Sequence, residues 1–236
     1  YEPVIQAIDR HGPGPERTCV IPGNHDTANF NNMASWHARS RRFKKYLAAY
    51  LPGGDARVSS PQYFPYTRKL ADGFSLIGLD STLKNTALGR IGPRQLEALD
   101  HFLSSHETGD DHKLILCHHA AVGETKLFTG FEIHYGNVLV DVDEFLSLLQ
   151  RHASRPSSPG ISVLSGHTHN KRIDTETVPG VNFITAPSFG GRFGEDFVFL
   201  EIFKDGSFLE LPTGKTDIRQ RTLRKFGKVL FPRIHT

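Results

Sequence analysis

Short apolar segments followed at once by polar, histidine-bearing clusters restrict the fold of this 236-residue sequence more than any other feature. Three such segments, at residues 19–21, 114–117 and 161–164, have the length and composition of buried strands. Apolar residues at helical intervals fill much of the sequence between them. Strands that alternate with helices in this way predict an α/β fold.

Turn and helix signals complete this interpretation. The turn at residues 71–73 predicts a β-hairpin, Pro93 predicts a helix start, and Asp141 predicts the cap of a second helix. After Gly166 the pattern becomes one of strands and turns alone. We therefore expect an α/β core with packed sheets. The expected helices cover residues 1–8, 34–50, 94–106 and 141–152, and the expected hairpin strands cover residues 63–70 and 74–79.

The three polar clusters have the composition of a metal site. Ligands of open α/β sheets bind beyond the carboxyl ends of the strands, so neighbouring parallel strands would bring the clusters to one edge. Imidazole nitrogens and an asparagine carbonyl oxygen suit borderline transition metals. Glycine in front of two clusters lets the backbone turn sharply and approach bound metals closely. The clusters are Gly23-Asn24-His25-Asp26, His118-His119 and Gly166-His167-Thr168-His169.

Each cluster taken alone has a plainer interpretation. The adjacent pair His118-His119 suits a polar loop or a hydrogen-bonded core position, and Gly23 to Asp26 suits a turn, because Asn and Asp favour turns. The ordered set, with each member directly after a strand, favours the metal site.

The ordered clusters resemble the last three signature blocks of the calcineurin-like metallophosphoesterases, over residues 23–169. Two further stretches, Gly78-Leu79-Asp80-Ser81 and Gly92 to Leu96, are similar to the branch that contains cyclic-nucleotide and glycerophosphodiester phosphodiesterases. The resemblance implies two packed mixed β-sheets flanked by helices, as in the β-sandwich of that family.

The resemblance also implies residue roles. Asn24, His118 and His167 would bind one metal ion, and His169 would bind a second ion. His25 would lie beside the substrate phosphate, as a general acid or as a stabiliser of developing charge. His119 matches no required ligand, so we expect it behind the ligands or at the rim. The two ions would be Mn, Fe or Zn.

The implied function is hydrolysis of a small phosphodiester by a hydroxide that bridges the two ions. Phosphomonoesterase and nuclease activities on the same fold are the alternatives within enzymes, and a non-catalytic binding module is the alternative outside them. Substrate specificity would lie in loops at residues 30–36, 123–137 and 188–195. The sequence indicates neither the substrate nor the oligomeric state.

The family has two earlier blocks, Asp-x-His and Gly-Asp-x-x-Asp, which supply the remaining ligands. Neither block occurs before Gly23. The chain starts at Tyr1, within a segment that resembles the helix leading to Gly23, so we expect the N-terminal part of the domain to be missing. We assign residues 1–212 to the metallophosphoesterase domain and residues 213–236 to a basic C-terminal extension.

The composition of the chain limits the kinds of binding partner and the cellular compartment that we expect. The net charge of +3 is too small to indicate nucleic acid by itself, and we favour a solvated basic face at residues 39–45 over a nucleic-acid contact. No apolar run approaches the roughly 20 residues that span a bilayer. The two cysteines, Cys19 and Cys117, lie in apolar segments and favour free thiols in a reducing compartment. We therefore expect a cytoplasmic protein.

Overall fold

The structure is a computed structural model, and it describes the parts of the chain that form the sheets and their helices. The described residues are 5–6, 9–10, 14–15, 18–27, 42–43, 45–51, 64–71, 73–83, 86–105, 109–122, 139–155, 158–168, 171–187, 199–203, 205, 207–211 and 232–234. Its named elements are α2 (Asn24–Thr27), η2 (Ala48–Tyr50), β1 (Tyr66–Ala71), β2 (Phe74–Gly78), α4 (Pro93–Ser104), β3 (His112–Leu116), α6 (Val142–Ala153), β4 (Ile161–Ser165), β5 (Arg172–Asp174), β6 (Val181–Thr185), β7 (Phe199–Ile202), β8 (Phe208–Leu211) and β9 (Pro232–Ile234).

A six-stranded mixed sheet forms the centre of the fold, with strand order β1-β2-β3-β4-β6-β5. Strands β2, β3, β4 and β6 run parallel, and β1 and β5 are antiparallel strands at the two edges. Every residue of β2 and of β4 is buried, as expected for strands covered on both faces. The predicted α/β class is confirmed.

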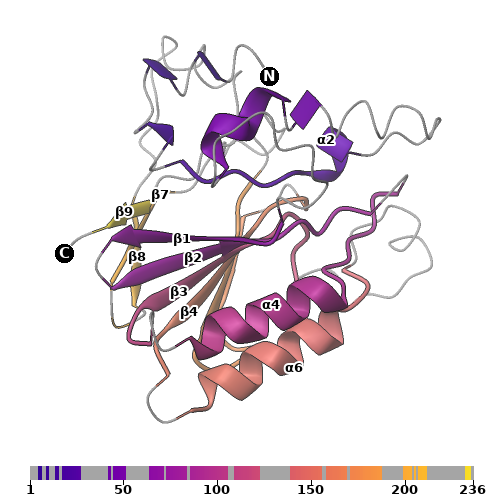
Figure 1. Cartoon of the computed structure of the whole chain (residues 1–236). Coiled ribbons are helices and arrows are strands. Elements are labelled where there is room, and N and C mark those ends of the chain that lie inside the picture. The colour runs from indigo at the N-terminus through magenta and orange to yellow at the C-terminus, as the bar shows by residue number, and fades with distance from the viewer. Residues whose placement is uncertain are drawn as a thin grey trace.

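The predicted hairpin and two of the predicted helices are confirmed. The hairpin joins β1 to β2, and Gly73 in its turn has a φ of 84°, which glycine adopts without steric cost. Helix α4 starts at Pro93, as the proline predicts, and α6 covers nearly all of the range expected from residue 141 to residue 152. The two helices lie side by side on one face of the sheet (Figure 1).

Asp141 differs from its expected role as a helix cap. Its side chain makes no capping bond to α6. Instead, its carboxylate accepts the backbone N–H groups of Ile91 at 3.0 Å and Gly92 at 2.6 Å. The residue thus ties the start of α6 to the start of α4, a contact across 50 residues that local sequence does not indicate.

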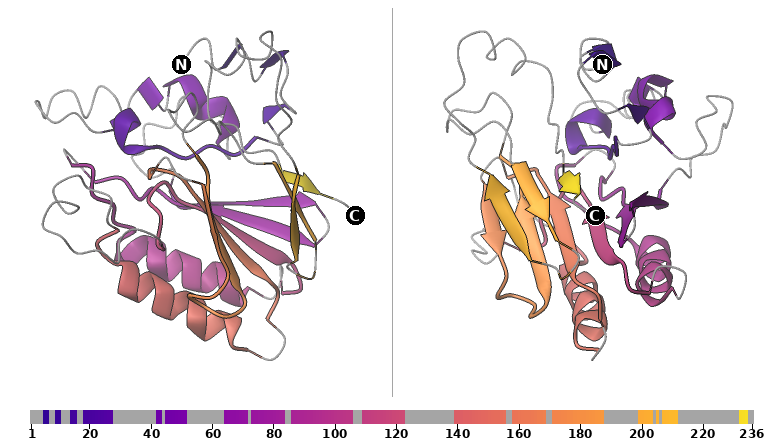
Figure 2. Two further views of the ribbon diagram at one scale, coloured as in Figure 1. Left: turned by 180° about the vertical axis from the view of Figure 1, so that it is seen from behind. Right: turned by 90° about the vertical axis from the view of Figure 1, so that its left-hand side faces the viewer.

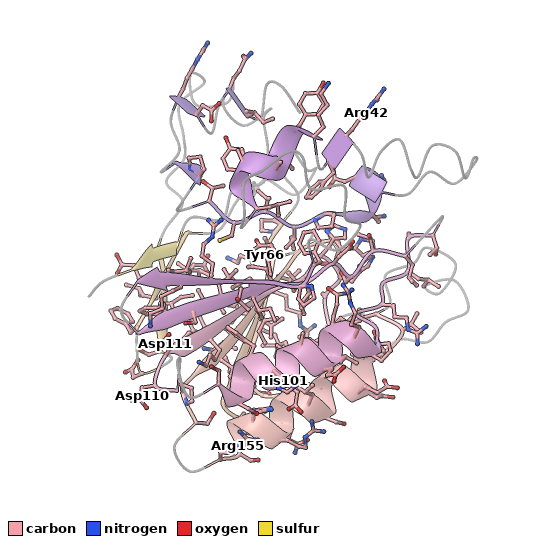
Figure 3. All side chains as sticks on the ribbon, viewed as in Figure 1. Arg42, Tyr66, His101, Asp110, Asp111 and Arg155 are labelled. Atoms are coloured by element: carbon pink, nitrogen blue, oxygen red, sulfur yellow. The ribbon has the colours of Figure 1, made fainter. Side chains whose placement is uncertain are left out.

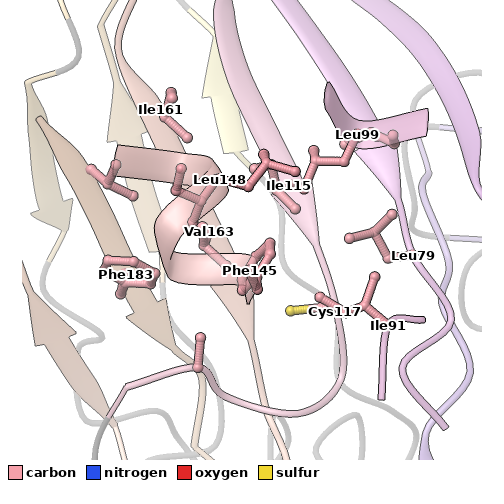
Figure 4. Packing of buried hydrophobic residues seen from close by; sticks show 14 of the residues in the cluster. Leu79, Ile91, Leu99, Ile115, Cys117, Phe145, Leu148, Ile161, Val163 and Phe183 are labelled. Atoms are coloured by element: carbon pink, nitrogen blue, oxygen red, sulfur yellow. The ribbon is translucent and has the colours of Figure 1, made fainter. Parts of the chain in front are cut away.

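One hydrophobic core fills the space between the sheet and the two helices. Ile115 and Val163 on the sheet pack with Leu99 of α4 and with Phe145 and Leu149 of α6, and all five side chains are buried. Figure 4 shows this packing from close by. Cys117 is part of the same core and is a free thiol, as is the half-buried Cys19.

A second core lies on the opposite face of the central sheet. It joins Leu76, Leu114 and Leu164 to Leu200 and Ile202 of β7. Strand β7 belongs to a three-stranded mixed sheet of order β8-β7-β9, whose β9 lies within the segment expected as the C-terminal extension. The two sheets and the helix pair can be followed in Figure 2.

The predicted strand near the N-terminus is wrong. Residues 18–23 belong to no strand, although Cys19 and Val20 pack against the second core. The carbonyl of Thr18 accepts a hydrogen bond from Arg68 Nη1 at 3.0 Å, and that of Val20 accepts one from the Tyr66 hydroxyl at 3.0 Å. Side chains of β1 therefore satisfy backbone groups that a neighbouring strand would otherwise satisfy.

The helix expected at residues 34–50 is helical where it is described, and it ends in η2. Phe43, Leu47 and Tyr50 form a third apolar cluster with Ile5 and Val20. The Tyr50 hydroxyl lies 2.6 Å from a carboxylate oxygen of Asp9. None of the helices in the described part of the chain combines the length and the apolar character that a membrane span requires.

Candidate metal centre

The parallel pairing of β3 and β4 places His118 beside His167. The strands are in register up to Leu116 and Leu164, and the ladder continues beyond them. The N–H of Cys117 donates to the Leu164 carbonyl at 3.1 Å, and that of Gly166 donates to the His118 carbonyl at 3.0 Å. The predicted convergence of these two clusters at one sheet edge is therefore observed.

His167 has an unusual backbone conformation. Its φ is 71°, in the left-handed region, and it is the only non-glycine residue with a positive φ among those described. Such a conformation costs an ordinary residue about 1–2 kcal/mol, and residues of this kind cluster at functional sites. The turn is closed by the N–H of Thr168, which donates to the Gly166 carbonyl at 2.8 Å. The sequence predicts the sharp turn at Gly166, but the residue with the left-handed backbone is His167.

Asn24 reaches His118 although its segment is not a strand. Asp26 and Gly23 close a short turn, in which Gly23 N–H donates to Asp26 Oδ2 at 2.8 Å and Asp26 N–H donates to the Gly23 carbonyl at 2.9 Å. A Cβ atom at Gly23 would lie 3.0 Å from His118 Cε1. Glycine therefore allows the close approach that brings the buried Asn24 against the His118 ring.

Three potential ligand atoms converge in this way. His118 Nε2 lies 2.9 Å from Asn24 Oδ1 and 3.0 Å from His167 Nδ1. Nitrogen and oxygen ligands bind transition metals at about 2.0–2.2 Å, so two ligand atoms at right angles around an ion lie about 3 Å apart. The donor set of two imidazole nitrogens and one amide oxygen fits a borderline transition metal.

His119 lies next to these atoms, but its two nitrogens are engaged elsewhere. One ring nitrogen from each of His118, His119 and His167 lies within 4.8 Å of the other two. His119 Nε2 lies 3.0 Å from the Ala87 carbonyl, which can only accept, so Nε2 carries a proton. Nδ1 then accepts the Ser81 hydroxyl at 2.9 Å, and Ser81 Oγ accepts the His119 N–H at 3.1 Å.

Burial keeps the His119 ring neutral. The residue has no exposed surface, and burial, reinforced by the neighbouring His167, lowers its pKa to about 3. Its ring packs against those of His118 and His167, with centroids 4.9 and 4.4 Å apart. His119 therefore packs against the His118 and His167 rings while its own ring nitrogens bond to Ala87 and Ser81.

Of the two remaining expected site residues, the structure describes His25 and not His169. His25 is exposed and lies on α2, directly after Asn24. His169, expected to bind the second ion, lies outside the described residues, as do the three expected specificity loops at residues 30–36, 123–137 and 188–195.

Sequence reasoning gave no role to Ser81 or Gly89, which complete the surroundings of His119. Ser81 is fully buried and follows β2, which is parallel to β3, so the rule that located His118 would also have located Ser81. A Cβ atom at Gly89 would lie only 2.3 Å from His119 Cγ. That close approach depends on packing between distant segments, which local sequence does not indicate.

No protein-family model matches the chain, and no curated protein matches it either.

Proposed function

We propose that this chain is a metal-dependent phosphoesterase that hydrolyses a phosphodiester. The convergence of Asn24 Oδ1, His118 Nε2 and His167 Nδ1 at 2.9–3.0 Å carries the proposal. The motif resemblance to the calcineurin-like metallophosphoesterases supports it. The central mixed sheet, with two helices on one face and a second sheet on the other, is also consistent with the β-sandwich that this family implies.

Asn24, His118 and His167 would hold one metal ion, and His169 would be a ligand of a second. When bound, such ions supply Lewis acidity toward the phosphoryl oxygens and lower the pKa of a water that attacks phosphorus. The buried His119 keeps the His118 and His167 rings in place through its ring contacts. Its hydrogen bonds to Ser81 and Ala87 hold the His119 ring in turn.

His25 would act on the substrate from the rim of this site. It follows the ligand Asn24 on the turn that Asp26 closes, and its side chain is exposed to solvent. An exposed imidazole beside a phosphoryl group can donate a proton to the leaving oxygen or hydrogen-bond a non-bridging oxygen. Neither role requires His25 to bind metal.

The test separates the catalytic role of His25 from metal binding. We expect H25A to keep its metal content by elemental analysis and to lower kcat by about 10²- to 10⁴-fold, the scale of general acid–base catalysis. Substrates with good leaving groups should be affected less, because they need less protonation. His101, an exposed histidine on α4, provides the matched control, and H101A should leave both quantities unchanged.

Activity is measured with Mn²⁺ on the chain extended at its N-terminus by the Asp-x-His and Gly-Asp-x-x-Asp blocks that the motif resemblance implies. Bis(p-nitrophenyl) phosphate should be hydrolysed faster than p-nitrophenyl phosphate. A marked preference for the monoester would instead assign the protein to the phosphomonoesterases. Loss of metal in H25A would make His25 a ligand and contradict the role proposed for it.

A further inference from the structure

Ser81 is a buried serine that is linked to the candidate metal centre through His119. It has no exposed surface, and it follows β2 at the edge of the sheet where the metal centre lies. Backbone hydrogen bonds hold this part of the chain. The N–H of Arg90 donates to the Ser81 carbonyl at 2.9 Å, and that of Leu79 donates to the Leu116 carbonyl at 2.8 Å. The Ser81 hydroxyl therefore extends from a fixed backbone position.

The Ser81 hydroxyl holds both the backbone and the side chain of His119. Ser81 Oγ accepts the His119 backbone N–H at 3.1 Å, and it donates to His119 Nδ1 at 2.9 Å. The other ring nitrogen, Nε2, donates to the Ala87 carbonyl at 3.0 Å. An imidazole that accepts at one nitrogen and donates at the other is fixed in one tautomer and one orientation. Both nitrogens of His119 are therefore occupied by hydrogen bonds.

The ring that Ser81 holds packs against both histidines of the candidate metal centre. Its centroid lies 4.9 Å from that of His118 and 4.4 Å from that of His167. Gly89 packs against the same ring so closely that a Cβ atom there would lie 2.3 Å from His119 Cγ. Protein interiors are packed densely, so a displacement of one ring is felt by the side chains that touch it. The orientation of His119 therefore affects where the two ligand rings lie.

A similar serine–histidine pair at the opposite end of the sheet provides a comparison. Ser162 Oγ lies 2.9 Å from His112 Nε2, and both residues are fully buried. The pair lies where β3 and β4 begin, at the end of the sheet where Figure 3 labels Asp111. The His112 ring packs against Phe74, with centroids 5.8 Å apart. A buried pair of this kind can thus belong to the core alone, and Ser81 differs because its partner ring touches two expected ligands.

We propose that Ser81 is a positioning residue of the metal centre, which acts through His119 to hold the His118 and His167 rings in the arrangement that binds the ion. The inference rests on the proposed function, because it requires these two histidines to be ligands. Groups that orient metal ligands without binding the ion typically change metal affinity by about 10- to 100-fold when they are replaced. Loss of the Ser81 hydroxyl leaves every expected ligand in place, so the ion should still bind at saturation, but more weakly.

The test is calorimetric titration of the chain and its variants with Mn²⁺, together with urea unfolding of each variant in the absence of metal. The S81A variant should bind Mn²⁺ about 10- to 100-fold more weakly than the wild type. The S81C variant keeps a side chain of similar size that makes weaker hydrogen bonds, so its affinity should be intermediate. The G89A variant displaces the His119 ring without altering Ser81, and it should weaken Mn²⁺ binding as well.

Ser162 provides the matched control, because S162A removes the same hydroxyl from a buried histidine at the other end of the sheet. This variant should lose stability in urea, as S81A does, yet bind Mn²⁺ as the wild type does. Equal weakening of Mn²⁺ binding in S81A and S162A would trace the effect to lost stability and would overturn the inference. Equal affinities of S81A and a wild type that binds Mn²⁺ would overturn the inference alone, whereas a wild type that binds no Mn²⁺ would overturn the proposed function with it.

Discussion

Replacing His167 by glycine and by alanine separates the backbone strain of this residue from the role of its ring. Both variants remove the imidazole and its contacts with His118 and His119. They differ in tolerance of the observed φ of 71°. Alanine keeps the clash that makes left-handed backbone cost about 1–2 kcal/mol, whereas glycine does not.

Glycine also loses more backbone entropy on folding, which offsets about 0.5–1 kcal/mol of that gain. We therefore expect metal-free H167G to be more stable than metal-free H167A by about 0.7 kcal/mol. Urea unfolding followed by circular dichroism in the presence of a chelator measures this difference. Stability of both variants should respond little to added Mn²⁺, because both lack a ligand.

His101 in α4 provides a control with the opposite sign. At a helical position alanine is preferred, so H101A should be more stable than H101G by about 1 kcal/mol. If H167A proved as stable as H167G, or more stable, the backbone at His167 would not be left-handed. The inference that the backbone of His167 is strained would then fail.

Three further predictions concern buried polar groups. The S81A variant should lose about 1–3 kcal/mol of stability, because His119 Nδ1 and N–H lose their partner, yet it should retain metal. D141A should lose a similar amount, since two backbone N–H groups near α4 become unpaired. Burial lowers the pKa of His112 from 6.5 to about 4. The stability that the neutral ring contributes is therefore fully present above pH 6.5 and is lost as the pH falls toward 4, because the unfolded chain takes up the proton first. In urea unfolding, the free energy of unfolding of H112N should decrease less over this pH range than that of the wild type.

The elements that local patterns specify could be predicted from the sequence. Pro93 fixes the start of α4, and the apolar runs before His118 and Gly166 become β3 and β4. The convergence of His118 and His167 also followed from the rule that ligands bind at the carboxyl ends of parallel strands. These features depend on short-range periodicity and on one topological rule.

Features that depend on distant partners could not be predicted in this way. Residues 19–21 have the composition of a strand, but no strand forms there, and the carbonyls of Thr18 and Val20 accept hydrogen bonds from Arg68 and Tyr66. Asp141 has the sequence context of a cap, but its partners lie at Ile91 and Gly92. The sequence interpretation similarly placed the sharp turn at Gly166, because nothing local shows that His167 adopts the left-handed backbone.

Calorimetric titration of the 236-residue chain with Mn²⁺ tests most directly whether Asn24, His118 and His167 form a metal site. We predict that the chain binds Mn²⁺ and that N24A, H118A and H167A each weaken binding strongly. H25A should bind as the wild type does, because His25 lies beside the site without being a ligand. Equal Mn²⁺ binding by the wild type and the H118A variant, or no Mn²⁺ binding by the wild type, would contradict the claim.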